Sequence, residues 1–389
     1  MNFIQTSSEL ADLCEKLAQE PYVAVDTEFI REKTYWPRLC LIQIASDNDE
    51  ACIDPLAMDL DMAPLFALMA NPNVVKVFHS ARQDLEIFYN LTGKVPAPLF
   101  DTQIAAMVCG FGESVSYQNI CASLLKVNLD KSQRFTDWSH RPLAPRQIEY
   151  ALCDVTYLRD VYKKLKEKLE SEGRVHWVDE EMALISSPET YKINPDECWK
   201  KIKSNSKDRR FLAVLKELAK WRELEAQRIN RPRKRILFDE NLVELALCQP
   251  RDRYEISNMR GFPKGIADSR YAGAILEAIE IGKATLPEKC PEVKPRPEAP
   301  KGKKALVELL HLLLEIKSEE YDVAPKLIAT SDDIVHIAID GKPNVPAMSG
   351  WRKDVFGDDA LALKNGELFI SYHPNKRRIN LTRKETKTQ

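Results

Sequence analysis

The sequence predicts an α/β domain with a mixed sheet, followed by two small all-helical domains. Three observations predict this order. Residues 1–195 alternate strand-like and helix-like segments, residues 206–285 and 303–375 have helical patterns, and a stretch with five prolines, Pro287–Pro300, lies between the two helical regions. At 389 residues the chain is long enough for two or three domains that each bury their own core.

Four segments of the first region read as strands, because they are rich in β-branched residues and are bounded by polar or turn residues. They are Pro21–Phe29, Leu39–Ala45, Ala51–Asp54 and Val74–His79. The helical patterns are Ala81–Asn90, Thr102–Val108, Tyr117–Leu125 and Pro145–Glu170. Since the early strands follow one another closely, we expect antiparallel neighbours, with the helices covering the sheet.

The remaining chain divides into two helical domains and two non-helical segments. We expect a first helical domain at residues 206–285 and a second at 303–375. Residues 286–302 form a linker whose prolines favour an extended, semi-rigid chain. The tail, residues 376–389, is polar and basic, and we expect it to be disordered.

The two helical regions resemble a divergent internal repeat. Ile236–Ala246 parallels Ile328–Ala338, and Met259–Phe262 parallels Met348–Trp351, and the spacing between the two blocks differs by only three residues. In each copy a polar residue opens an apolar helix, and a glycine followed by an aromatic residue closes a loop. Two unrelated helical bundles that share capping signals are the alternative.

Composition is typical of a globular protein, with 44% hydrophobic and 30% charged residues. The N-terminus lacks a basic stretch followed by an apolar run, and we find no apolar stretch long enough to span a bilayer. The nine cysteines form no CxxC pair, which favours reduced thiols. We therefore expect a cytoplasmic protein without a membrane partner.

The formal charge of −2 conceals a basic region. Residues 200–265 contain 18 Lys and Arg against 9 Asp and Glu, a net charge of +9, so the rest of the chain carries −11. This asymmetry fits a phosphate-binding module beside a cation-binding one, or a solvated helical surface. The densest basic cluster comprises Arg231, Arg233, Lys234 and Arg235.

Asp26 and Glu28 stand at the end of the first predicted strand. Because side chains alternate along a strand, both carboxylates point to the same face. Two adjacent buried carboxylates repel each other unless a cation holds them, and oxygen ligands suit Mg²⁺ or Mn²⁺. Exposed acids at a strand end are the alternative explanation.

Three further residues complete a possible acidic site. Asp84 lies about one turn inside a predicted helix, where an acid also interacts favourably with the helix dipole. Tyr150 and Asp154 are four residues apart and share one helix face, so a phenol and a carboxylate could together orient a metal-bound water. Taken alone, each of these residues is also explained as part of a core or a helix end, as is His79.

The order and spacing of these five residues resemble the DEDDy group of 3′→5′ exonucleases. The flanking sequences are similar to the ribonuclease D family in six places, namely DTEF (26–29), RLCLIQIAS (38–46), FHSARQDLE (78–86), FDTQIAA (100–106), LDKSQRFTDWSHRPL (129–143) and YALCDV (150–155). The resemblance implies a ribonuclease H-like exonuclease domain followed by two HRDC domains. It matches the four acids and the tyrosine, and is weakest in the second repeat.

The resemblance also implies a mechanism. Two divalent ions, Mg²⁺ or Mn²⁺, about 3.5–4 Å apart would activate water and stabilise the leaving oxygen. Asp26, Glu28 and Asp154 would bind the first ion, and Asp26 with Asp84 the second. Tyr150 would orient the attacking water rather than act as a strong base, since an ordinary phenol has a pKa of about 10. The expected substrate is RNA with a free 3′ end, with transfer-RNA precursors as the family expectation, and we expect a monomer.

Other charged residues near the motifs have local explanations. Asp101 is expected to cap a helix, and Asp137, Trp138, Arg141 and Pro142 to shape the cleft wall. Lys131 and Arg134 could approach phosphate or could be solvated loop charges. The basic cluster at 231–235 would supply sequence-independent phosphate contacts, with plain solubility as its alternative role.

Two other functions compete with this prediction. A 3′→5′ DNA exonuclease would use the same acids, since discrimination depends on contacts to the ribose 2′-hydroxyl. An inactive nucleic-acid-binding scaffold would be indicated by loss of a carboxylate, and all four are present.

Overall fold

The computed structural model describes residues 3–130, 136–259, 261–262, 265–292, 300–341, 343–375 and 378–384. The chain forms two compact units. The first comprises Met1–Glu28, Leu41–Thr190 and Arg296–Gln389, and the second comprises Phe29–Cys40 and Tyr191–Pro295. Within the described residues, no helix combines the length and apolar character needed to cross a membrane.

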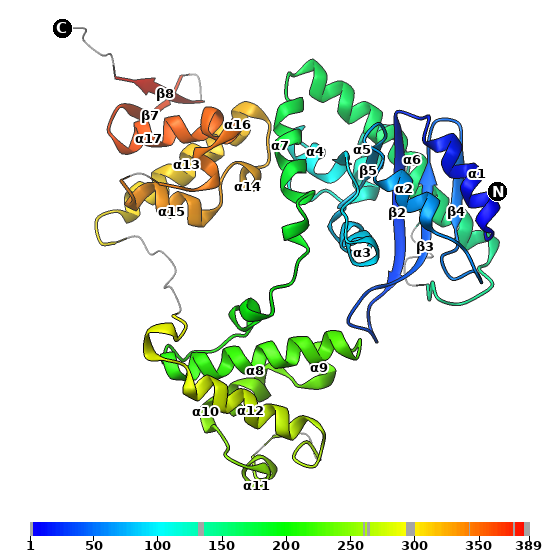
Figure 1. Ribbon diagram of the computed structural model, residues 1–389. Coiled ribbons are helices and arrows are strands. Elements are labelled where there is room, and N and C mark those ends of the chain that lie inside the picture. Colours follow the sequence, from blue (N-terminus) through cyan, green and yellow to red (C-terminus); the bar gives the residue numbers. More distant parts are fainter. Residues whose placement is uncertain are drawn as a thin grey trace. The chain divides into compact units, whose positions relative to one another are not determined.

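A six-stranded mixed sheet, in the order β1-β4-β3-β2-β5-β6, forms the centre of the N-terminal part (Figure 1). Its strands are β1 (Phe3–Ile4), β2 (Tyr22–Ile30), β3 (Arg38–Ala45), β4 (Glu50–Ile53), β5 (Val75–Phe78) and β6 (Leu99–Asp101). The β3–β4 pair is antiparallel, whereas β1–β4, β2–β5 and β5–β6 are parallel. The predicted mixed sheet is confirmed, and the four predicted strands lie within one residue of their observed bounds.

Helices lie between and after these strands; those that begin at Ser7, Ala63 and Val175 were not predicted from the sequence, whereas the other four were. The helices are α1 (Ser7–Leu17), α2 (Ala63–Met69), α3 (Arg82–Thr92), α4 (Thr102–Val108), α5 (Tyr117–Leu125), α6 (Pro145–Ser171) and α7 (Val175–Ile185). The long helix α6 packs on the sheet through an apolar stripe, in which Val155 and Leu158 contact Ala24 of β2 and Ala45 of β3 in one buried cluster. Burial of this stripe fixes the height and rotation of α6 above β2.

The second unit contains a bundle of helices. Its elements are η2 (Pro195–Lys201), α8 (Arg209–Arg228), α9 (Arg233–Ile236), α10 (Asp239–Cys248), α11 (Arg253–Ser257), α12 (Tyr271–Ala284) and η3 (Pro287–Lys289). Helix α8 is the centre of this core, since Val214, Leu215 and Leu218 are almost completely buried. The segment Phe29–Cys40, which connects β2 to β3, belongs to this unit, although the sequence pattern places it in the N-terminal domain.

The C-terminal region is helical as far as Lys364. Its helices are α13 (Lys304–Tyr321), α14 (Pro325–Ile328), α15 (Ser331–Ile339), η4 (Pro346–Met348), α16 (Gly350–Arg352), η5 (Lys353–Gly357) and α17 (Asp358–Lys364). An antiparallel hairpin follows, formed by β7 (Leu368–His373) and β8 (Arg378–Arg383). The prediction that 303–375 is helical throughout and that 376–389 is disordered is therefore wrong for these strands. Leu368–His373 is rich in the β-branched and aromatic residues of a strand, and Ile379 and Thr382 are the β-branched residues of β8, whose basic neighbours concealed the pattern.

The two helical regions follow the same backbone path where the repeat was predicted. Asn230 and Asp322, which follow α8 and α13, both have a left-handed backbone with φ of 50°. Leu237 (φ −154°, ψ 145°) and Ala329 (φ −151°, ψ 144°) then end the one-turn helices α9 and α14. Both pairs are separated by 92 positions, as an internal repeat requires.

Candidate active site

Strand β2 places two carboxylates on the face that α6 covers. Tyr22 and Ala24 face α6 in the buried cluster, so the alternation of the strand directs Asp26 and Glu28 to the same face. Thr27 lies between them and is buried. This agrees with the prediction from the Asp-x-Glu pattern.

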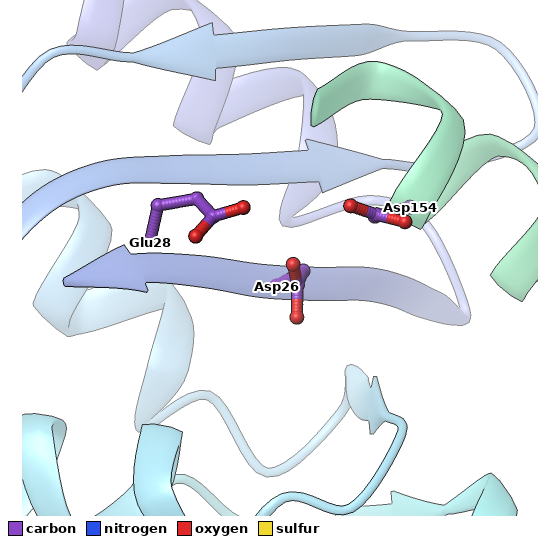
Figure 2. A group of neighbouring side chains, drawn as sticks. All are labelled: Asp26, Glu28 and Asp154. Carbon is purple, nitrogen blue, oxygen red and sulfur yellow. The ribbon is translucent and has the colours of Figure 1, made fainter. Parts of the chain in front are cut away.

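Helix α6 completes the group with Asp154 (Figure 2). Each of Asp26, Glu28 and Asp154 offers a carboxylate oxygen, and these oxygens all lie within 4.8 Å of one another. Asp154 reaches this position because its neighbours Ala151 and Val155, which are fully buried, hold that face of α6 against the sheet. Three acids from two elements far apart in the sequence therefore converge on one point.

Burial makes ionisation of this cluster unfavourable. It raises the pKa of Glu28 to about 9, with further contributions from the charges of Asp26 and Asp154. It also raises the pKa of Asp154 to about 7, and burial together with the Asp154 charge raises that of Asp26 well above its usual range. Among the described residues, no lysine or arginine forms an ion pair with these three side chains.

The donor set fits a hard divalent cation. Three carboxylates offer oxygen atoms only, which is the ligand type that Mg²⁺ and Mn²⁺ prefer. An ion would also relieve the mutual repulsion that raises the pKa of Glu28. Among the described residues the site is therefore anionic, and a bound divalent cation would balance its charge.

Asp84 lies beside this group rather than in it. It is in the first turn of α3, is only 7% exposed, and accepts a hydrogen bond from the Thr27 hydroxyl. Burial and the charge of Asp26 raise its pKa well above the usual range. The three clustered oxygens do not include one from Asp84. Thr27, which sequence reasoning passed over, therefore positions the fourth acid, and its place between Asp26 and Glu28 is the signal that could have identified it.

Tyr150 lies one turn before Asp154 on α6, as the four-residue spacing predicts. Its ring stacks on buried Trp138, with ring centroids 6.3 Å apart and planes 30° apart. Tyr150 and Asp154 line a cleft of about 480 Å³, together with Arg146 and residues 127–130. Arg146, Tyr150 and Asp154 follow one another at intervals of four, so the same periodicity could have identified this cleft arginine.

Asp101 and His79 have the structural roles that the sequence predicts, a helix cap and a hydrogen-bonded histidine. Asp101 caps α4 by accepting hydrogen bonds from the backbone N–H groups of Gln103 and Ile104, and it also accepts from Ser80 and Ala81. His79 lies 2.9 Å from the Thr102 hydroxyl and 3.1 Å from the carbonyl oxygen of Val115, consistent with a structural histidine.

The residues predicted to shape the cleft wall, 137–138 and 141–142, all lie in the described part of the chain. Arg141 forms a bidentate ion pair with Asp54, at 2.9 and 2.7 Å, and donates to the carbonyl oxygen of Trp138. This fixes the loop that carries Trp138 against Tyr150. Lys131 and Arg134 lie outside the described residues.

One residue of the basic cluster in the second unit is paired within the protein. Arg233 makes two hydrogen bonds to Glu223, one to the Tyr35 hydroxyl at 3.0 Å, and lies 5.0 Å from the centre of the Tyr35 ring. Glu223 is 1% exposed, so its charge requires this partner. Arg231, Lys234 and Arg235 are exposed and, within the described residues, form no ion pair. This pairing makes Arg233 a weaker candidate for phosphate contact than Arg231, Lys234 and Arg235.

Comparison with known proteins agrees with the fold. A family model described as "3′-5′ exonuclease" matches residues 1–170, and one described as "HRDC domain" matches residues 211–279. Ribonuclease D from Granulibacter bethesdensis is 48% identical over 368 residues, which are 94% of this chain and 93% of that protein. Ribonuclease D from Gluconacetobacter diazotrophicus is 47% identical over 367 residues, which are 94% of this chain and 93% of that one.

One solved structure is similar to this chain along nearly its whole length. Escherichia coli RNase D, described as an exoribonuclease involved in structured RNA processing, has a TM-score of 0.81 at 30% identity and covers 94% of this chain and 99% of its own. The mixed sheet, the carboxylate group under α6 and the exonuclease match together define a 3′-5′ exonuclease. More particularly, the chain belongs to the ribonuclease D family of 3′-5′ exoribonucleases, as the sequence motifs predicted.

Proposed function

We propose that this chain shortens RNA from its 3′ end by hydrolysis and releases 5′-mononucleotides, with two divalent cations, Mg²⁺ or Mn²⁺, as cofactors. The observation that carries the proposal is the group of three half-buried carboxylates whose oxygens lie within 4.8 Å of one another. Such a group is unfavourable without cations, which makes metal binding its most economical explanation. Transfer-RNA precursors are the proposed substrates, and we propose that the enzyme acts as a monomer in the cytoplasm.

In the proposed hydrolysis the four acids would bind the ions, Tyr150 would orient water, and Arg146 would contact the phosphate. Asp26, Glu28 and Asp154 would hold the first ion, and Asp26 with Asp84 the second. When bound, such ions lower the pKa of water and stabilise the charge on the leaving oxygen. Tyr150, one turn from Asp154 and stacked on Trp138, would orient the attacking water through its hydroxyl. Arg146 lines the same cleft, where its charge suits the phosphate of the terminal nucleotide.

The predicted domain boundaries remain part of this proposal. We propose an exonuclease domain over residues 1–195, a first HRDC domain over 206–285 and a divergent second one over 303–375. The family model for HRDC supports the first, and the shared backbone path of α9–α10 and α14–α15 supports the second. Arg231, Lys234 and Arg235 are the proposed phosphate contacts of the first domain.

A gel time course tests the proposed activity. RNA with a 3′ tail and DNA of matched sequence, each labelled at the 5′ end, are incubated with Mg²⁺, with Mn²⁺ or with EDTA. We expect stepwise shortening of the RNA from its 3′ end, slower shortening of the DNA, and no reaction in EDTA. Equal or faster shortening of DNA would identify a DNA exonuclease, and no shortening with either metal would indicate a scaffold.

A further inference from the structure

Gln43, in the middle of β3, is a buried polar side chain without a partner. The residue is 0% exposed, and within the described part of the chain neither its Nε2 nor its Oε1 makes a hydrogen bond. A carboxamide can donate two hydrogen bonds and accept two, and leaving it unpaired inside a protein costs stability. Apolar side chains such as Leu41, Ile42 and Ile44 surround it in the sequence, so nothing local requires an amide here.

The side chain of Gln43 lies on the face of the sheet that α6 covers. In the β3–β4 ladder Gln43 is directly opposite Cys52. The Sγ atom of Cys52 lies 4.0 Å from the carbonyl oxygen of Ile148 in α6. Since residues opposite each other in a ladder point to the same face, Gln43 also points toward α6.

On the other side of β3, the neighbour of Gln43 is the part of β2 that carries Asp26. Strand β2 lies next to β3, and Ala24 of β2 shares a buried cluster with Ala45 of β3. The strand beside β2 runs opposite to it in Figure 2, and this strand is β3 because β5 is parallel to β2. Because Gln43 precedes Ala45 by two residues and Asp26 follows Ala24 by two, both side chains point to the face that α6 covers, on neighbouring stretches of adjacent antiparallel strands.

We propose that Gln43 is a positioning residue of the metal centre. When the centre holds its divalent ion, the Nε2 of Gln43 would donate to the Asp26 carboxylate, and its Oε1 would accept a hydrogen bond from water at the same site. A carboxylate offers only acceptors and a metal-bound water offers donors, so one carboxamide satisfies both. Such partners orient the ligands of a metal and tune its affinity. This inference rests on the proposed function.

Binding of Mn²⁺ alone, followed by electron paramagnetic resonance of the free ion, tests the role of Gln43 without any substrate. Gln43→Met keeps the volume and removes both hydrogen-bonding groups. We expect Mn²⁺ affinity to fall by about 10- to 100-fold, the usual effect of losing an outer partner of a metal ligand. The control is Asn90→Leu on α3, which removes another unpaired buried amide nitrogen and should leave the affinity unchanged.

A second variant keeps the test decisive if Gln43→Met does not fold. Gln43→Glu is isosteric and adds a negative charge, so beside Asp26 it should tighten Mn²⁺ binding, by roughly tenfold. An affinity within about twofold of wild type in Gln43→Glu, or in a folded Gln43→Met, would overturn the proposal and leave Gln43 as an unpaired amide only. If Asp154→Asn also binds Mn²⁺ as wild type does, the carboxylate group is not the metal site, and the proposed function fails instead.

Discussion

Two buried carboxylate sites in this protein are built on opposite principles. In the second unit, Glu223 is surrounded by donors from Arg233, Tyr35 and Gln227. Burial acts to raise the pKa of Glu223, but the hydrogen bonds from Arg233 and Tyr35 outweigh it and the pKa is lowered. In the first unit, burial raises the pKa of Glu28 to about 9, and the charges of the neighbouring carboxylates Asp26 and Asp154 add to this increase.

The difference shows how a structural acid is distinguished from a candidate metal ligand. A carboxylate that belongs to the architecture has its counter-charge supplied by the chain. One whose neighbours are also acids, and whose charge the described residues do not balance, marks a place where an external cation fits. The same comparison distinguishes two kinds of cation in the basic cluster. Arg233 pairs with buried Glu223, whereas Arg231, Lys234 and Arg235 are exposed to solvent. The following predictions test each side of it.

Removing one acid of the metal cluster should have the largest effect. Asp154→Asn keeps the shape and removes a charge, so we expect RNA cleavage to fall by roughly 10³-fold or more, about 4 kcal/mol of transition-state stabilisation. Single-turnover rates with saturating RNA and chelator-treated protein measure it. RNA binding should survive, since the basic region dominates it. Retained turnover would contradict the assignment of Asp154 to a metal.

Removing the internal cation should affect stability instead. Arg233→Ala leaves the Glu223 charge buried without its main partner, and we expect the second unit to lose about 3 kcal/mol of unfolding free energy. Urea unfolding followed by tryptophan fluorescence measures the loss. Asp154→Asn serves as the control, because it should not destabilise the protein in the absence of metal. An Arg233→Ala protein as stable as wild type would mean that solvent already satisfies Glu223.

The two sites should respond to pH in opposite directions. Without metal, the raised pKa of Glu28 means that the folded state holds this proton more tightly, so the first unit loses stability as pH rises from about 4.5 to about 9. The lowered pKa of Glu223 stabilises the second unit above the ordinary value of 4.5, and this contribution is lost as pH falls below it.

Calorimetry over this pH range, with EDTA or with Mg²⁺, measures both effects. Mg²⁺ at 100 times its dissociation constant should stabilise the first unit by about 2.7 kcal/mol and abolish its alkaline destabilisation. The acid destabilisation of the second unit should not respond to Mg²⁺. A first unit whose stability is independent of both pH and Mg²⁺ would contradict the cluster as a metal site.

The smallest effect is expected from the unpaired cations. Replacing Arg231, Lys234 and Arg235 together by alanine should weaken RNA binding and lower the slope of log affinity against log salt by about 2, since each single-strand phosphate contact contributes about 0.7. Fluorescence anisotropy at several salt concentrations measures the slope. The matched control is Arg228→Ala, whose guanidinium is held by Glu225. An unchanged slope in the triple variant would leave these residues a role in solubility alone.

Much of the fold and of the site was accessible from local patterns. The helix Thr102–Val108 and its cap Asp101 were predicted with correct bounds, as was Tyr117–Leu125. The common face of Asp26 and Glu28 follows from the geometry of a strand, and that of Tyr150 and Asp154 from the geometry of a helix. Such rules act over a few residues, so the sequence carries them without reference to the rest of the chain.

Tertiary structure decided which of these local faces meet. The apolar stripe of α6 brings Asp154 to Asp26, while Asp84 stands beside the cluster with Thr27. Packing also brings Arg233 into an ion pair with Glu223, and it places Phe29–Cys40 in the second unit. Residue type and spacing predicted four acids of one site, but distances between distant side chains depend on how whole elements bury their apolar faces, which no local pattern records.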